Sequence, residues 1–208
     1  NTFELCPTDI AKLTLKMQEI EVKFLNIDKE ALEKKLLGIG AEKVGDMFLR
    51  HVAFDFPGWP LNKDNSWVRV RDEGDKVTLT YKKRLGVTSQ DGSTKDAGME
   101  EVELEVSSYE LIKSFLKKIG MVEKHGEAQK KRSKWKRGDV EFDIDTIALI
   151  PPYLEIEAKS WEDIDRVIIE LGLDPKEKKI CSSQQIYMMY GINVEEYETI
   201  NFEEVIKK

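Results

Sequence analysis

Polar, mostly charged, residues alternate with apolar residues in six segments of the chain. These segments are EIEVK (19–23), WVRVR (67–71), VTLTYKKR (77–84), EVELEV (101–106), VEFDID (140–145) and LEIEAK (154–159). A period of two is typical of β-strands with two different faces, because successive side chains point to opposite sides of the sheet. The alternation constrains the chain to a fold whose strands each carry one apolar face and one charged face.

The charged face lacks the mixture of Ser, Thr, Asn and Gln that a solvent-exposed face usually has. Almost every polar position ionises, and the sign of the charge is sorted by strand. Either the charged side of an open sheet lies in water, or the sheet closes so that the charges line a lumen and helices cover the apolar faces. The sorted signs favour the lumen, whose charges must be solvated, paired or bound to a charged ligand.

The order of the predicted elements favours an antiparallel sheet. Strand-like segments lie at 17–25, 47–56, 66–72, 76–84, 98–106, 129–136, 139–147 and 153–159; helix-like segments lie at 28–38, 107–119, 161–171 and 183–191, and polar loops at 57–65 and 86–97. Consecutive strands with few helices are typical of an antiparallel barrel or sandwich. We predict a mainly-β α+β fold, a closed eight-stranded antiparallel β-barrel with helices packed outside. We expect residues 1–16 to form an N-terminal extension and residues 17–208 to form one domain.

Composition argues against several classes of function. The net charge of −7 argues against a general nucleic-acid coat, which needs a basic face. The two cysteines, Cys6 and Cys181, form no disulfide framework and no metal-ligand motif, which predicts a reducing, cytoplasmic location. No apolar run approaches the ~18 residues of a membrane helix. We expect no nucleic-acid or membrane partner, and a monomer or a homodimer.

Several segments together resemble one known family. EIEVK (19–23) resembles the ExExK signature of the CYTH superfamily, the triphosphate tunnel metalloenzymes. This superfamily includes class IV adenylyl cyclases, thiamine triphosphatases and inorganic triphosphatases. Further resemblances follow in the family's order, in WVRVRDEGDKVTLTYK (67–82), EEVELEV (100–106), DTIALIPPYLEIE (145–157) and SSQQIYMMYGI (182–192). The resemblance therefore covers the chain from about 19 to 192.

The resemblance implies a tunnel with an acidic side that binds Mg²⁺ or Mn²⁺ and a basic side that binds a triphosphate. Carried over by position, the metal-ligand candidates are Glu19, Glu21, Asp145, Glu155 and Glu157. The substrate-binding candidates are Lys23, Arg69, Arg71, Lys82, Lys130 and Arg132, with Lys23 also the catalytic candidate. Carboxylate oxygens suit hard divalent cations, and arginine and lysine suit phosphate oxygens. The implied substrates are ATP, inorganic triphosphate or thiamine triphosphate.

The chain departs from the family pattern at two places. In the family's triphosphatases a tyrosine of the second strand partners the signature lysine, whereas Ala53 and His51 stand in this region of HVAFD (51–55). Pro151-Pro152 stands where the family usually has a turn. The leading hypothesis is a metal-dependent triphosphatase that cleaves a phosphoanhydride bond. The alternatives are a class IV adenylyl cyclase, which the loss of the tyrosine weakens less, and a polyphosphate- or nucleotide-binding module without turnover.

Overall fold

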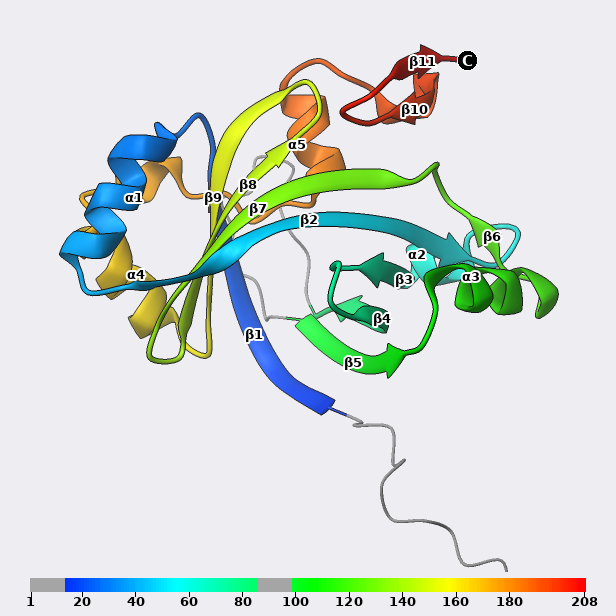
Figure 1. Ribbon diagram of the computed structural model, residues 1–208, viewed down its shortest axis with the longest axis horizontal. Helices are drawn as coiled ribbons and strands as arrows, with labels where there is room; N and C mark the ends of the chain where they lie inside the picture. The colour runs from blue at the N-terminus through cyan, green and yellow to red at the C-terminus, as the bar shows by residue number, and fades with distance from the viewer. Residues whose placement is uncertain (1–13, 86–98) are drawn as a thin grey trace, which may run out of the picture.

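The structure, a computed structural model, describes residues 14–85 and 99–208 (Figure 1). Its strands are β1 (Thr14–Phe24), β2 (Glu42–Asp55), β3 (Ser66–Asp72), β4 (Val77–Arg84), β5 (Met99–Val106), β6 (Val122–Glu123), β7 (Ala128–Arg137), β8 (Val140–Ile147), β9 (Ile150–Ala158), β10 (Tyr197–Ile200) and β11 (Val205–Lys207). Its α-helices are α1 (Lys29–Gly38), α2 (Pro60–Lys63), α3 (Tyr109–Lys118), α4 (Trp161–Glu170) and α5 (Ser183–Met189). The fold is therefore α+β and mainly β.

The strands of the main sheet are all antiparallel to their neighbours. Their order is β3-β4-β5-β1-β9-β8-β7-β2-β6, and β2 also pairs with β3. The first strand, β1, lies between β5 and β9, so strands that are distant in sequence are joined at this point. The β10–β11 hairpin forms a separate two-stranded sheet.

The eight strands predicted from the alternation are all present. β2 starts at Glu42 rather than at residue 47, and β1 starts at Thr14, within the segment that we assigned to an extension. Four shorter elements, α2, β6, β10 and β11, were not predicted, because segments of two to four residues are too short to show a periodicity. The predicted loop at 86–97 lies outside the described residues.

Side-chain caps start the three longer helices where the sequence predicts them. The Asp28 Oδ1 atom accepts a hydrogen bond from the Ala31 amide at 2.9 Å, and Ser160 Oγ accepts one from the Asp163 amide at 3.2 Å. Ser108 caps α3 in the same manner. Each cap satisfies an amide that has no partner within its helix, which fixes the first residue of the helix.

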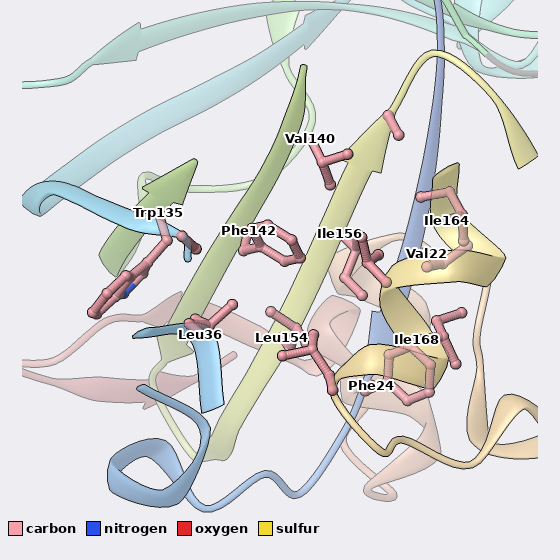
Figure 2. Packing of buried hydrophobic residues seen from close by; sticks show 14 of the residues in the cluster. Val22, Phe24, Leu36, Trp135, Val140, Phe142, Leu154, Ile156, Ile164 and Ile168 are labelled. Atoms are coloured by element: carbon pink, nitrogen blue, oxygen red, sulfur yellow. The ribbon is translucent and has the colours of Figure 1, made fainter. Parts of the chain in front are cut away.

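The apolar faces of the strands pack under the helices. Figure 2 shows Val22, Phe142 and Ile156 of the sheet against Ile164 and Ile168 of α4, all nearly or fully buried. Helix α1 joins the same cluster, α3 covers a second cluster on β2 and β3, and α5 covers a third near the β8–β9 turn. Burying one such side chain stabilises the folded state by about 1.5–3 kcal/mol. Packing under the helices therefore keeps the apolar faces of the strands on the side of the sheet opposite the charged faces.

The turn between β8 and β9 differs from the prediction. Pro151 and Pro152 lie within β9, and the turn is made by Ala148 and Leu149, whose φ is +67°. A proline at the start of a strand removes an amide donor without breaking the pairing farther along. No helix in the described part of the chain is both long and apolar enough to cross a membrane.

Candidate functional site

The charged faces of the strands line a common cavity of about 580 Å³. Its charged wall residues are Glu21, Lys23, Arg69, Arg71, Lys82, Arg84, Glu101, Lys124, Lys130, Arg132, Lys134, Glu141, Asp143, Glu155 and Glu157. Nine of these are Lys or Arg and six are Asp or Glu, so the wall carries an excess of positive charge although the whole chain carries −7. An interior of this kind suits an anionic ligand. We call it the main cavity.

Three carboxylates gather on one wall of the main cavity. Ligand atoms of Glu21, Glu155 and Glu157 all lie within 4.8 Å of one another. The register of β1 and β9 brings them together, because Glu21 pairs with Glu157 and the next pair that faces the cavity is Lys23 with Glu155. Oxygen ligands at this spacing are suited to a hard divalent cation. We call these three residues the acidic cluster.

Cations beside the acidic cluster keep one of its members ionised. Burial alone would raise the pKa of Glu155, but Lys23, Lys130 and Arg132 hold that pKa well below its ordinary value. The Lys23 ammonium contacts Glu21 and lies 3.2 Å from Glu155 Oε2. Two backbone hydrogen bonds between Lys23 and Lys179 hold β1 at this point. Lys23 therefore lies directly against the proposed metal ligands.

Asp145 lies outside the acidic cluster. It is fully buried, and its Oδ2 accepts hydrogen bonds from Lys130 Nζ at 2.6 Å and from Arg132 Nη2 at 2.7 Å. Arg132 Nε also donates to Oδ1 at 2.7 Å, and the same guanidinium contacts Asp143 and Glu155. Burial of Asp143 raises its pKa to about 7 despite Arg132. The side chains of Lys130, Arg132 and Asp145 thus form one buried ion-pair network, which we call the paired wall.

The opposite wall holds cations in a different state. The Nε atoms of Arg69 and Arg71, on β3, are buried and have no hydrogen-bond partner among the described residues. Burial, and then the neighbouring Arg71, lower the pKa of Arg69 to about 9. Burial and Arg69 lower the pKa of Lys82 to about 8, although its Nζ lies 2.6 Å from Glu101 Oε2. Arg69, Arg71 and Lys82 form what we call the open wall. Their positive charges repel one another, so a bound anion would stabilise them.

His51 and Ala53 of β2 also line the main cavity. His51 pairs in register with Arg71, and Ala53 pairs with Arg69. Burial and four nearby cations, Arg69 first among them, lower the pKa of His51 well below its ordinary value. The imidazole is therefore neutral at pH 7, and the nearby cations disfavour its protonation. Ala53 brings no functional group to the cavity.

The structure brings nine of the predicted site residues to the main-cavity wall. These are Glu21, Lys23, Arg69, Arg71, Lys82, Lys130, Arg132, Glu155 and Glu157. Asp145 lies behind the wall, and the side chain of Glu19 lies outside the described part of the structure, although its backbone pairs with Met99.

Other wall residues come from segments that the alternation does not cover. Asn62 and Asn65 come from the α2 region, and residues 182–185 come from the start of α5. Strand periodicity carries no information about loops and helices. The partner of Asp145, in contrast, could be read from the sequence. The two-residue Gly138-Asp139 turn between β7 and β8 sets the register that pairs Asp145 with Arg132. The sequence of this turn could therefore have predicted the ion pair between Arg132 and Asp145.

Comparisons with known proteins identify relatives of this architecture. The model of the CYTH domain family matches residues 17–180. The PH1012 protein from Pyrococcus horikoshii OT3 is 26% identical, with a TM-score of 0.66, and the match covers 81% of this chain and 98% of that chain. No curated protein matches.

Two further solved structures show the same fold at lower identity. A candidate adenylate cyclase from Vibrio parahaemolyticus is 14% identical, with a TM-score of 0.67, and the match covers 83% of this chain and 98% of that chain. A candidate adenylyl cyclase from Hippeastrum, which has a dominant triphosphatase activity, is 18% identical, with a TM-score of 0.57 and coverage of 85% and 97%.

Proposed function

Because the chain belongs to the CYTH domain family, we propose that it is a divalent-metal-dependent triphosphatase that cleaves a phosphoanhydride bond of a triphosphate-bearing substrate. One observation carries the proposal. The main cavity opposes the acidic cluster, which suits a metal ion, to the buried and unpartnered Nε atoms of Arg69 and Arg71, which suit phosphate oxygens. A Mg²⁺- or Mn²⁺-bound triphosphate would satisfy both walls at once.

We also propose that the sheet closes into a tunnel around this substrate. The strand pairings run from β3 through β4, β5, β1, β9, β8 and β7 to β2, and β2 pairs again with β3. Closure removes the free edges of these strands and would enclose the substrate among the charged side chains.

The donor set of the acidic cluster fits a hard divalent cation. Glu21, Glu155 and Glu157 offer only carboxylate oxygens, and the pKa of Glu155 is held well below its ordinary value, so this ligand is deprotonated at neutral pH. When bound, the ion would withdraw electron density from the phosphoryl group and neutralise charge on the leaving oxygen.

The protein's own cations have separate tasks. Arg69, Arg71 and Lys82 would bind and orient the phosphate chain, because their charge faces the main cavity. Lys130 and Arg132 keep raised pKa values, since nearby carboxylates outweigh the effect of burial, and they hold a fixed positive charge behind the substrate. Lys23, whose ammonium lies against Glu21 and Glu155 on the main-cavity wall, would stabilise the negative charge that the transferred phosphoryl group develops.

One observation favours a class IV adenylyl cyclase as the second candidate. Ala53 lies opposite Arg69 and supplies no hydroxyl group, whereas the family's triphosphatases use a tyrosine in this region. A hydrolase would need another base to accept the proton of the attacking water. We assign this task to His51 on the main-cavity wall, where the negative charge of a bound triphosphate would offset the cations that lower the pKa of His51.

A phosphorus NMR time course distinguishes the candidates. The protein is incubated with ATP and, separately, with inorganic triphosphate, in Mg²⁺ and then in Mn²⁺. Release of orthophosphate supports the triphosphatase, whereas pyrophosphate and a cyclic monophosphate from ATP support the cyclase. Shifted resonances without a product would indicate a binding module, and spectra without shift or product would contradict all three functions.

The metal requirement is tested at Glu157. We expect Glu157→Gln to abolish the metal dependence of triphosphate binding or turnover, because it removes one charged ligand of the acidic cluster. Titration of Mn²⁺ by its paramagnetic signal measures the loss directly. Glu177→Gln, at an exposed position after α4, is the control and should leave the titration unchanged. Equal effects of both substitutions would contradict the metal site.

A further inference from the structure

A second cavity of about 230 Å³ adjoins the main cavity at the end of β3. Both cavities have Leu49, Arg71, Arg132 and Lys134 in their walls, so these side chains border both cavities. The remaining wall comes from the first half of β2 and from Glu73, Asp75 and Lys76 in the β3–β4 turn. A phosphate chain that outgrew the main cavity past Arg71 would enter this space.

The three cations that the cavities share already have carboxylate partners. Arg71 Nη2 lies 2.5 Å from Glu73 Oε1, and Lys134 Nζ lies 2.6 Å from Glu141 Oε2. Arg132 belongs to the paired wall. The other charged residues of the second cavity are Glu73, Asp75 and Lys76 of the β3–β4 turn. Glu73 Oε2 lies 3.7 Å from Lys76 Nζ. The wall of the second cavity thus has four cations, Arg71, Lys76, Arg132 and Lys134, and two carboxylates, but each of the four cations already belongs to an ion pair.

The turn between β3 and β4 fixes the position of Glu73. The Glu73 amide donates a hydrogen bond to the Lys76 carbonyl at 2.9 Å, and the Gly74 amide donates one to Asp72 Oδ1 at 2.9 Å. Gly74 has a φ of +93°, which a residue with a side chain adopts only with strain. The Glu73 side chain is 10% exposed and lies against Arg71. Its carboxylate is thus a built part of the cavity wall.

We propose that Glu73 determines how many phosphates the site accepts. Its carboxylate closes the second cavity to a phosphate chain longer than a triphosphate and so selects short polyphosphates. The inference rests on the proposed function, since it concerns the length of the ligand that the main cavity binds. A fourth phosphate would place its negative charge beside Glu73 and would compete with Glu73 for Arg71. Without the carboxylate, Arg71 and Lys76 would both face the incoming phosphate.

The test compares the affinities for inorganic triphosphate and inorganic tetraphosphate. Dissociation constants are measured by calorimetry, with Mg²⁺ present, for the wild type, Glu73→Gln and Asp72→Asn. Asp72→Asn is the matched control because it removes the same charge from the adjacent residue, which binds Arg50 and does not line the second cavity, and Asn keeps an oxygen that can accept the Gly74 hydrogen bond. We expect the wild type to bind triphosphate at least as tightly as tetraphosphate. Glu73→Gln should shift the ratio about tenfold toward tetraphosphate, and Asp72→Asn should leave it unchanged.

Three results would overturn the inference. They are a wild type that prefers tetraphosphate, a Glu73→Gln variant that changes both affinities equally, and an Asp72→Asn variant that shifts the ratio as much as Glu73→Gln. Binding of triphosphate by the wild type with any of these results leaves the proposed function intact. A wild type that binds neither polyphosphate would instead contradict the proposed function, and this inference with it. Urea unfolding of each variant confirms that the compared proteins are folded, and Glu73→Ala provides a second variant without the carboxylate.

Discussion

The paired wall and the open wall face the same cavity, yet their cations are in opposite states. On the paired wall, Lys130 and Arg132 bind the buried carboxylate of Asp145, and their pKa values are raised. On the open wall, burial and mutual repulsion lower the pKa of Arg69 to about 9 and that of Lys82 to about 8. A charged residue in a binding cavity is therefore not by itself evidence of a ligand contact. The two walls differ in whether nearby carboxylates outweigh burial and neighbouring cations, as they do for Lys130 and Arg132 but not for Arg69 and Lys82.

The largest expected effect is the loss of stability on breaking the paired wall. Asp145→Asn leaves Lys130 and Arg132 buried without their shared carboxylate, which should lower the free energy of unfolding by about 3–5 kcal/mol. Urea denaturation measures this change. Arg69→Met is the comparison on the open wall, and it should leave the free energy of unfolding unchanged or raise it, because it removes a buried cation that repels its neighbours. Equal losses in both variants would show that the two walls do not differ.

An intermediate effect is expected for binding on the open wall. Arg69→Ala should weaken triphosphate binding about 10- to 100-fold, the range for losing a hydrogen bond to a charged group. Calorimetric titration with inorganic triphosphate gives the change. Arg166→Ala is the control, since Arg166 lies on α4 and contacts only Asp163 in the described structure. Similar losses in the two variants would contradict the assignment of the open wall.

The smallest expected effect is proton uptake by Lys82. Its pKa of about 8 leaves this lysine mostly neutral at pH 8.5, and a bound anion raises the pKa and favours the ammonium form. Triphosphate binding at pH 8.5 should therefore take up a fraction of a proton, and the uptake should shrink toward pH 7, where Lys82 is already charged. Calorimetry without metal, in two buffers of different ionisation enthalpy, measures the uptake. An uptake that persists undiminished in Lys82→Met would assign it to another group.

The sequence predicts the strands better than it predicts the roles of their charges. Alternation identifies the charged face of β8, which carries Asp145, and the resemblance names Lys130, Arg132 and Asp145 as site candidates. Whether a charge meets a ligand or a partner depends on the register across neighbouring strands. Asp145, a metal-ligand candidate by motif, is paired with Arg132 through the short turn after β7.

Other parts of the site depend on contacts that no local pattern records. The second cavity arises because the β3–β4 turn lies beside the first half of β2, and Glu73 follows directly after the alternating segment. The pKa values of Arg69 and Lys82 follow from burial among like charges, which requires the folded arrangement. Segments such as α2 and α5 contribute wall residues without any periodicity.

The position of β1 between β5 and β9 also bears on how the protein is made. β1 is synthesised before the other strands of the main sheet, but Glu21 acquires its neighbour Glu157 only when β9, the last of these strands in sequence, has left the ribosome. Until then β1 has an unpaired edge, and pairing across such a sequence distance is slow. This edge of β1 therefore stays unpaired until β9 has been synthesised, and any metal site built on the acidic cluster can form only after synthesis has passed residue 157.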